Sequence, residues 1–210
     1  MNDELARQYL SVWLNLQCVG IRENRLIRVN GNTCDDVESV MLAVSPAGGC
    51  WKFYSESLPR FLIEQIEAVS SIHDENIVRV ILEHGSFPVT EIRREITHYF
   101  PVAPLIETPD VSFLGDTADT FDTFAVMKNG VVASRSWSIR KNDISAEIAV
   151  ETDERYRRRG YGRQVVAAWA KHQINNGKEA IYSHRKGNIE SWALAKSAWA
   201  TQFIEVLSYH

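Results

Sequence analysis

The chain has 210 residues, which is enough for one large domain or two small ones, each with its own hydrophobic core. A formal net charge of −4 argues against a dedicated nucleic-acid-binding protein. No apolar run is long enough to cross a bilayer, and the N-terminal residues lack the apolar segment of a signal peptide. We therefore expect a cytoplasmic protein with no nucleic-acid or membrane partner.

The cysteines and histidines show no metal-binding pattern. Cys18, Cys34 and Cys50 are an odd number without CxxC spacing, which favours free thiols in a reducing compartment. The six histidines are scattered, and none stands beside Cys or Glu at ligand spacing. We expect no metal site.

The first half of the chain predicts helices around a pair of strands. Residues 4–18 carry apolar side chains at helical spacing. The segments 39–45 and 50–54 predict two strands joined by a Pro-Ala-Gly-Gly turn. Three further helices are expected, over residues 60–70 after Pro59, between Asp74 and His84, and over a short segment starting at Thr90.

A proline-rich segment divides the chain. Residues 101–115 hold three prolines and end in a glycine, which is typical of a boundary between domains. We predict a mixed α/β lobe over residues 1–104, which would form a wall of the acceptor site, and a second domain over residues 105–210. In the alternative, strands near residues 26–29 and 41–44 join the same sheet and make a single domain.

The second half alternates strands and helices. Lys128-Asn129-Gly130 predicts a hairpin turn, because Asn-Gly supplies the positive φ that such turns need. Strands are expected over residues 121–127, 131–139, 145–152, 180–184 and 203–209, and helices over residues 160–175 and 188–200. The fold class is therefore α/β, with a mixed, mainly antiparallel sheet flanked by helices.

The segment from Glu147 to Gly162 carries the chemistry. It predicts a strand, an arginine-rich loop and a helix start. Gly160 and Gly162 have no Cβ, so backbone N–H groups can approach a phosphate closely at a helix N-terminus, where the helix dipole favours an anion. Three successive arginines, Arg157, Arg158 and Arg159, add positive charge. The segment predicts a phosphate-binding loop.

Arg157-Arg158-Arg159-Gly160-Tyr161-Gly162 resembles the (Q/R)-x-x-G-x-(G/A) signature of the GNAT superfamily of acyl-CoA-dependent N-acetyltransferases. The resemblance implies that this loop, Tyr161 included, wraps the pyrophosphate of acetyl-CoA, the cosubstrate. It implies that main-chain groups of Val150, Glu151 and Thr152 bind the pantetheine arm. Asn188 and Ser191 match the Asn-x-x-Ser/Ala motif, which lies near the sulfur end of the coenzyme in that family.

The resemblance also suggests catalytic residues. Glu147 stands in Ala-Glu-Ile, as does the base of histone-type members, and deprotonation is needed because an ammonium ion has no lone pair to attack a thioester. A solvated or arginine-paired Glu147 is the alternative. His184, at the end of a strand, is a second candidate base, or otherwise a partly exposed strand-end histidine. The family's acidic tyrosine is replaced by Ala195, which leaves Tyr182 and Tyr209 as substitutes or as packing residues.

The sequence therefore favours an N-acetyltransferase that moves an acetyl group from acetyl-CoA to a primary amine of a small molecule or peptide. The rival is a non-catalytic module that binds acyl-CoA or a protein partner. An RNA contact through the arginine loop is a weaker third reading. The acceptor, the acyl length and the oligomeric state, a homodimer included, are left open.

Overall fold

The computed structural model describes residues 1–17, 19–22, 25–28, 39–69, 75–116 and 120–210. The chain forms two compact units: unit 1 comprises Met1–Ile96 with Phe203–His210, and unit 2 comprises Thr97–Gln202. The predicted division at residue 104 is thus displaced, and the last strand belongs mainly to the first unit. Within the described ranges, no helix has the length and apolar character needed to cross a bilayer.

Unit 1 is a sheet with helices. Its strands lie in the order β1-β2-β4-β3-β11, followed by the first part of β5. β11 pairs antiparallel with β3, from Glu205 opposite Val44 to Tyr209 opposite Val40, which explains why the C-terminus belongs to this unit. The elements are α1 (Asp3–Leu16), β1 (Val19–Arg22), β2 (Arg25–Arg28), β3 (Val40–Val44), β4 (Cys50–Ser55), α2 (Arg60–Glu67), α3 (Glu75–His84), β5 (Ile92–Tyr99) and β11 (Thr201–Tyr209).

The helices predicted over the first 84 residues are confirmed, except that Asp74, the expected cap of α3, lies outside the described residues. One apolar core holds α2, α3 and the strands together, with Leu62, Ile66 and Leu82 packed near Leu207 and Tyr209. Burial of these side chains is the main stabilising term for this unit. Cys50 is an exposed free thiol, and Cys18 and Cys34 lie outside the described residues.

The helix predicted to start at Thr90 is wrong, because residues 92–99 form strand β5. The segment Ile-Thr-His-Tyr is rich in β-branched and aromatic side chains, which suit a pleated and buried surface. The arginines before it suggested a solvated helix face. Instead, Arg94 lies within ion-pair distance of Glu75 at 3.6 Å and of Glu205 at 3.4 Å.

Unit 2 is built on a second run of strands, in the order β5-β10-β9-β8-β7-β6, where only the last residues of β5 belong to the unit. All neighbours from β9 to β6 are antiparallel, whereas β9 and β10 are parallel. The elements are β6 (Val111–Gly115), β7 (Phe121–Lys128), β8 (Val131–Lys141), β9 (Ser145–Thr152), a 3-10 turn η1 (Glu154–Tyr156), α4 (Tyr161–Asn175), β10 (Glu179–Arg185) and α5 (Ile189–Ser197).

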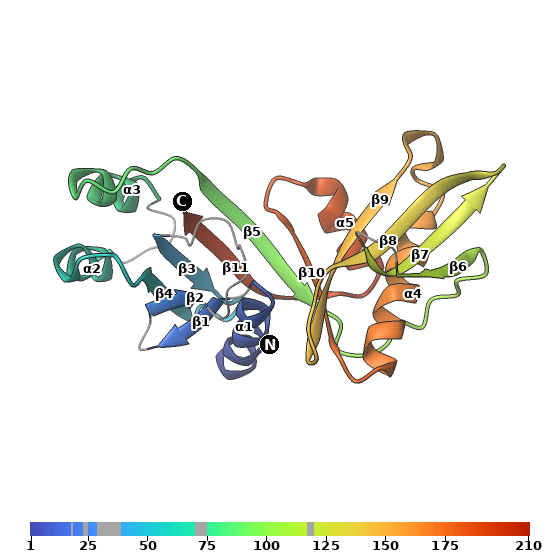
Figure 1. Ribbon diagram of the computed structural model, residues 1–210, viewed down its shortest axis with the longest axis horizontal. Helices are drawn as coiled ribbons and strands as arrows, with labels where there is room; N and C mark the ends of the chain where they lie inside the picture. Colours follow the sequence, from blue (N-terminus) through green and yellow to red (C-terminus); the bar gives the residue numbers. More distant parts are fainter. Residues whose placement is uncertain (18, 23–24, 29–38, 70–74, 117–119) are drawn as a thin grey trace. The chain divides into compact units, whose positions relative to one another are not determined.

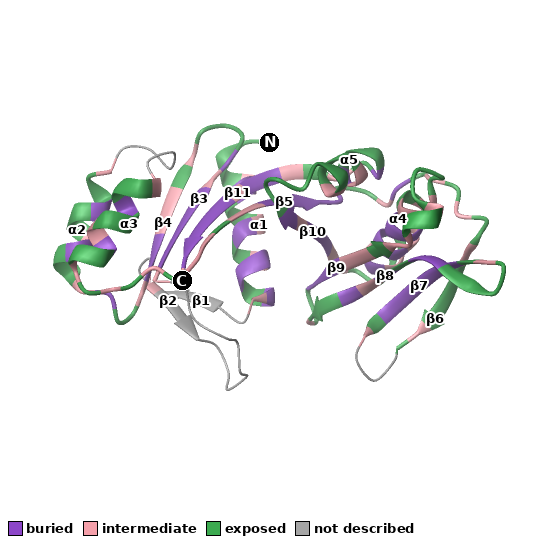
Figure 2. Cartoon of the chain, turned by 90° about the horizontal axis from the view of Figure 1, so that it is seen from above, coloured by how far each residue is buried: buried purple, intermediate pink, exposed green. Residues whose placement is uncertain are grey.

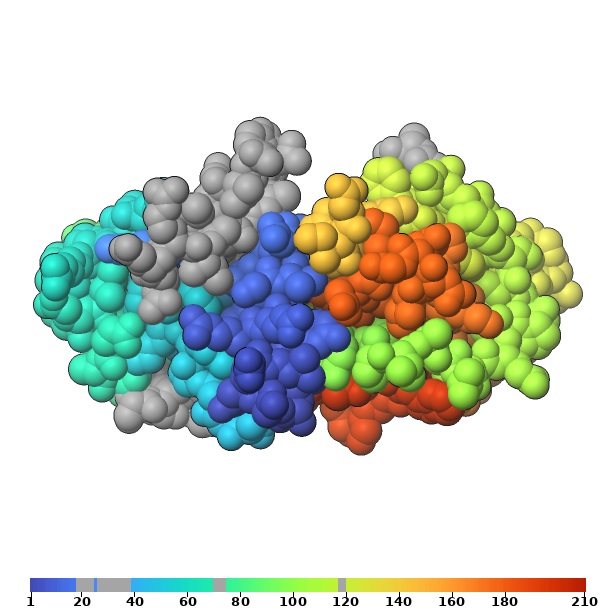
Figure 3. Space-filling model, turned by 90° about the horizontal axis from the view of Figure 1, so that it is seen from below, coloured from blue at the N-terminus to red at the C-terminus, as the bar shows by residue number. Residues whose placement is uncertain are grey.

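The expected mixed, mainly antiparallel sheet is confirmed, as is the hairpin at Asn129-Gly130, whose φ angles are 52° and 77°. The predicted boundary segment, residues 101–115, is not a linker throughout, because its last five residues form strand β6. Figure 3 shows the green chain that follows β5 running across one face of unit 2. Phe100, at its start, is buried in the core of this unit.

Helix α4 covers one face of unit 2. Its residues Val166, Trp169 and Ala170 are buried against Ile148 of β9 and Tyr182 of β10 (Figure 2). The helical spacing of these side chains gives α4 one apolar stripe, which the sheet covers. Trp169 is fully buried and anchors the helix. The first turn of α4 is thereby fixed beside the end of β9.

Strands β9 and β10 separate along their length. They pair only at their beginnings, where Glu179 is opposite Ser145, Ala180 opposite Ala146, and Ile181 opposite Glu147. Beyond that point β9 remains paired with β8 as far as Thr152. The main chain of β9 after Glu147 therefore has an edge that its parallel neighbour leaves open. This fork organises the candidate site.

Candidate active site

The predicted phosphate loop connects β9 to α4. Asp153 starts the 3-10 turn by accepting the N–H of Arg155 at 3.0 Å. The chain then adopts left-handed φ angles at Arg158 (62°) and Gly160 (82°). Gly160 is the N-cap of α4 and provides no side-chain cap. The first N–H groups of α4 have no partner within the helix, so an anion is a suitable ligand for them.

Gly162 allows the helix start to approach the strand closely. A Cβ at this position would lie 3.1 Å from Oγ1 of Thr152. The Thr152 hydroxyl is itself bonded to Ser134 at 2.8 Å and has limited freedom to move. The two glycines therefore have different functions, since Gly160 permits the left-handed turn and Gly162 permits the close approach.

The arginines of the loop are not equivalent. Arg155 is bound to Asp153 at 2.8 Å, and these bonds lower the pKa of the Asp153 carboxyl to about 2. Arg157 lies 3.6 Å from Glu190 of α5 and so connects the loop to the next helix. Arg158 and Arg159 have exposed side chains, and Arg159 lies over the Tyr156 ring at 5.6 Å. These two guanidinium groups are the best placed for a phosphate.

The three strand residues predicted to bind pantetheine lie on the open part of β9. Val150 is half-buried, and Glu151 accepts two hydrogen bonds from Arg135, at 2.8 and 3.0 Å. Thr152 is held by Ser134. Beyond Glu147, β9 has no pairing partner on its β10 side within the described residues, so the main-chain groups of these three residues are unpaired on that edge.

Asn188 and Ser191 form the start of α5. Asn188 is the N-cap, and its Oδ1 accepts the N–H of Ser191 at 3.0 Å. The Ser191 side chain is hydrogen-bonded to the Tyr182 phenol. Burial raises the pKa of Tyr182, and the bond to Ser191 lowers it by a smaller amount. Ala195 is fully buried in the same apolar cluster as Tyr182.

Glu147 lies at the branch of the fork, opposite Ile181. Its side chain is only 4% exposed and forms an ion pair with Arg140 at 2.8 Å. Ala146 and Ile148 point into the core beneath α4. Because successive strand residues point to opposite faces, Glu147 lies on the other face of the sheet. Glu147 is therefore paired with an arginine, which is the alternative that the sequence left open beside a catalytic base.

His184 is buried, not partly exposed, with a relative exposure of 6%. Its Nδ1 lies 2.9 Å from the carbonyl oxygen of Arg185. A neutral ring that donates through Nδ1 has its lone pair on Nε2. Among the described residues, nothing hydrogen-bonds to His184 Nε2, although this atom is buried. The geometry leaves a bare imidazole lone pair, which is the form that a general base requires.

His98, on β5, was not predicted as a site residue. It is 2% exposed, and its ring stacks on His184 with centroids 5.2 Å apart and planes at 23°. Burial and the neighbouring His184 lower the pKa of His98 to about 4, against a hydrogen bond to the Tyr182 backbone that raises it. Its Nδ1 is also without a partner in the part of the chain that the structure describes. The signal that could have placed it on a buried strand is the set of β-branched and aromatic residues around it, Ile96, Thr97 and Tyr99.

The predicted residues thus fall into three groups. The phosphate loop and the start of α5 are joined through Arg157 and Glu190. His184 shares a cluster with Tyr182 and His98. Glu147 lies on the other face of the sheet.

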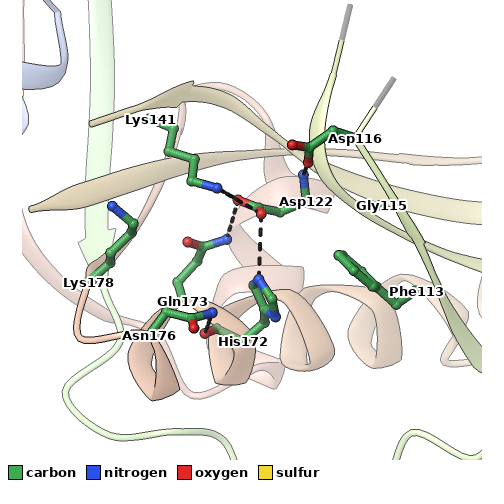
Figure 4. A pocket seen from close by; sticks show the side chains of 9 residues that line it. All are labelled: Phe113, Gly115, Asp116, Asp122, Lys141, His172, Gln173, Asn176 and Lys178. Atoms are coloured by element: carbon green, nitrogen blue, oxygen red, sulfur yellow. Dashed lines mark hydrogen bonds and ion pairs between the residues drawn. The ribbon is translucent and has the colours of Figure 1, made fainter. Parts of the chain in front are cut away.

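A pocket of about 560 Å³ opens near the C-terminal end of α4 and contains none of the predicted site residues. Its floor is the buried Asp122, whose carboxylate accepts bonds from Lys141 (2.8 Å), Gln173 (2.8 Å) and Ser138 (3.1 Å), as Figure 4 shows in part. Burial alone raises the pKa of Asp122, but these bonds outweigh it and lower the pKa. Within the described residues, no group of three His, Cys, Asp or Glu is placed to hold a metal ion.

Comparison with known proteins finds one family model and several solved structures that resemble the chain. Residues 126–197, about a third of the chain, match the family model described as FR47-like protein. No curated protein matches the chain. A structure described as a putative acetyltransferase from the GNAT family of Novosphingobium aromaticivorans superposes with a TM-score of 0.50 at 14% identity, over 58% of this chain and 66% of that one. The match therefore spans just under two thirds of that protein.

Two further structures are similar over more of the chain. A GNAT-family acetyltransferase from Colwellia psychrerythraea is 12% identical over 80% of both chains, with a TM-score of 0.49. A GCN5-related N-acetyltransferase-like protein from Streptococcus suis is 13% identical over 82% of this chain and 84% of its own, with a TM-score of 0.45. The predicted resemblance to GNAT acetyltransferases is confirmed at the level of fold.

Proposed function

Because the chain has the GNAT fold and the FR47-like match lies within unit 2, we propose that it is an acyltransferase that moves an acetyl group from acetyl-CoA to a primary amine. One observation carries the proposal: the fork between β9 and β10 opens beside a helix start that has no side-chain cap. A strand edge and an anion site at the end of one strand suit an extended ligand with a phosphate at one end.

The residues of the loop fit the coenzyme. A Cβ at Gly160 would be strained, and a Cβ at Gly162 would crowd Thr152, so both glycines keep the backbone available to a phosphate. Arg158 and Arg159 would neutralise phosphate charge, while Val150 to Thr152 would bind the arm through the main chain. Acetyl-CoA supplies the activated acyl group. The loop would anchor it far from the reacting bond, which aligns the reacting end.

The reaction needs a base and an acid. The amine nitrogen forms a bond to the acyl carbon as the carbon–sulfur bond breaks. An ammonium substrate loses two protons in all, of which one is taken up by the departing thiolate and one leaves to solvent. His184 Nε2 is the better base, because Glu147 is already neutralised by Arg140. Tyr182 is the better acid than Tyr209, whose hydroxyl donates to the Glu75 carbonyl in unit 1.

One observation supports the rival function, which is a binding module without turnover. Ala195 is fully buried where the family has its acidic tyrosine. Such a module would bind acetyl-CoA through the same loop and release no free coenzyme A with any amine. Turnover separates the two functions, whereas binding alone does not.

Calorimetric titration with acetyl-CoA tests the phosphate loop. We expect micromolar binding by the wild type, and at least a tenfold loss in the Arg159→Ala/Gly160→Asp variant, since charge-assisted phosphate contacts each contribute about 1.5–3 kcal/mol. Arg60→Ala, an exposed arginine of α2 paired with Glu64, is the matched control and should bind normally. A folded wild type that binds no acetyl-CoA would overturn the proposal. An amine screen that follows thiol release then decides between enzyme and binding module.

A further inference from the structure

Two buried imidazoles of unit 2 present lone pairs that have no donor among the described residues. They are Nδ1 of His98 and Nε2 of His184. Both rings are more than nine-tenths buried and lie face to face on the neighbouring strands β5 and β10 (Figure 1). An unsatisfied buried polar atom costs about 1–3 kcal/mol, so two in one stack call for an explanation.

The tautomers follow from the atoms that are already bonded. His184 Nδ1 is within 2.9 Å of the Arg185 carbonyl oxygen and must be the ring N–H donor. His98 is hydrogen-bonded to the Tyr182 backbone, and since its Nδ1 has no partner, the bonded atom is Nε2. The N–H group of each ring is therefore bonded to a backbone carbonyl of β10. The other nitrogen of each ring is an acceptor that has no donor among the described residues.

Two free acceptors on stacked rings suit a partner with two donor hydrogens. A primary or secondary ammonium group has at least two N–H bonds, whereas a quaternary ammonium has none and an alcohol hydroxyl has one. His184 stands three residues after Ile181, the last residue of β10 that pairs with β9, so the stack lies on the part of β10 that has separated from β9. An amine held here would lie at the end of the coenzyme slot that is remote from the phosphate loop.

We propose that His98 Nδ1 and His184 Nε2 together bind the acceptor amine in its ammonium form. The proposal rests on the acyltransferase function and adds His98 as the residue that positions the amine at the base. His184 Nε2 takes one proton from the ammonium and becomes an imidazolium that still donates through Nδ1 to Arg185. His98 Nδ1 accepts a second N–H and holds the nitrogen in place. No electron transfer or additional reactant is needed.

The first test is a binding measurement that needs no turnover. The ¹⁵N resonances of the histidine side chains are recorded while methylammonium is added, with tetramethylammonium, which has no N–H, as the matched control. We expect His98 Nδ1 and His184 Nε2 to shift with methylammonium alone. Equal shifts with both ions, or none with either, would overturn the proposal, because the two lone pairs would then have another partner such as buried water.

The second test is kinetic. With benzylamine as the acceptor, the KM for the amine is measured beside the affinity for acetyl-CoA. His98→Phe should raise the KM for benzylamine about tenfold, while acetyl-CoA affinity stays unchanged. His98→Gln keeps a donor near the position of Nε2 and has no acceptor at the position of Nδ1, so it replaces the Phe variant if that variant is unfolded. An unchanged KM for benzylamine in a folded variant would refute the proposal.

The two tests separate this inference from the function on which it rests. A wild type that binds no acetyl-CoA would refute the acyltransferase function, whatever the histidines do. Normal acetyl-CoA binding and amine acetylation, together with unaltered kinetics in His98→Phe, would refute only the histidine site. His84→Gln, on an exposed turn of α3 in unit 1, serves as the control histidine and should change neither readout.

Discussion

At the scale of single residues, unit 2 contains two buried polar clusters of opposite character. The Asp122 carboxylate accepts hydrogen bonds at both oxygens, from Lys141, Gln173 and Ser138. The histidine stack instead leaves two acceptors without donors in the described structure. A fully bonded cluster stabilises the fold, whereas an incomplete cluster is suited to a ligand. We therefore assign the Asp122 cluster a role in stability and propose the histidine stack as the ligand site.

Replacing Asp122 with asparagine should lower the free energy of unfolding by about 2–4 kcal/mol, because Lys141 loses its buried partner. Asparagine tolerates the left-handed φ of 49° at this position, so the change isolates the charge. The measurement is chemical denaturation at pH 7. Asp110→Asn, which removes the partially exposed pair with Lys128, should cost less than about 1 kcal/mol. Equal effects of the two substitutions would contradict the network.

His98 should make stability depend on pH. Its pKa of about 4 in the fold lies below the ordinary value of 6.5, so the unfolded chain binds one more proton between these values. The free energy of unfolding should therefore fall as the pH is lowered from 6.5 to 4, with a slope that approaches about 1.4 kcal/mol per pH unit for this group. Tyr182 and His184 are the titratable groups whose rings contact it.

Denaturation curves at several pH values check this expectation. Subtracting the curve of His98→Gln from that of the wild type isolates the contribution of His98, since the other carboxylates and histidines are shared. The difference should shrink steadily below pH 6.5. His84→Gln should leave the wild-type slope intact. A wild type and a His98→Gln variant that run parallel from pH 7 to 4 would show that His98 is not buried in its neutral form.

At the scale of elements, the sequence predicted those structural features that depend on residues close together in the chain. The Asn129-Gly130 hairpin, helix α4 and the left-handed turn at Gly160 before it each follow from signals a few residues apart. Strand β5 was mistaken for a helix because its charged first half draws attention away from the β-branched and aromatic residues of its second half. His98 was missed because its stacking partner, His184, lies on a strand far along the sequence.

The backbone of Trp199, just after the end of α5, is strained. It follows the C-cap with a φ of 67°, a left-handed conformation that a bulky residue rarely adopts and that glycine adopts freely. Because half of the ring is exposed, little packing is lost on removing it. Trp199→Gly should stabilise the protein by about 0.5–1 kcal/mol, measured as a rise in the midpoint of thermal unfolding. Ala193→Gly, in the interior of α5, should lower the midpoint. A fall in both variants would refute the strain.

At the scale of the whole molecule, strand pairing rather than sequence order defines the two units. β11 follows α5 directly in the sequence, yet its residues from Glu205 onward pair with β3. No local pattern indicates which strand a terminal strand will join, because register and partner depend on contacts between distant segments. A division by linker composition therefore assigned this strand to the second domain, and the structure assigns most of it to unit 1.

This pairing makes a prediction about stability. Leu207 is fully buried in the core that joins α2, α3 and the strands of unit 1. Leu207→Asp places a charge there and should destabilise unit 1 by more than about 3 kcal/mol. Hydrogen exchange followed by mass spectrometry should then show loss of protection over β3 and β4. Protection over α4 and β9, together with the affinity for acetyl-CoA, should persist, since the phosphate loop lies wholly in unit 2. Thr201→Asp, exposed at the start of β11, is the control. Equal loss of protection in both units would mean that they unfold as one body, and the C-terminal strand would then support the acyl-CoA site as well as unit 1.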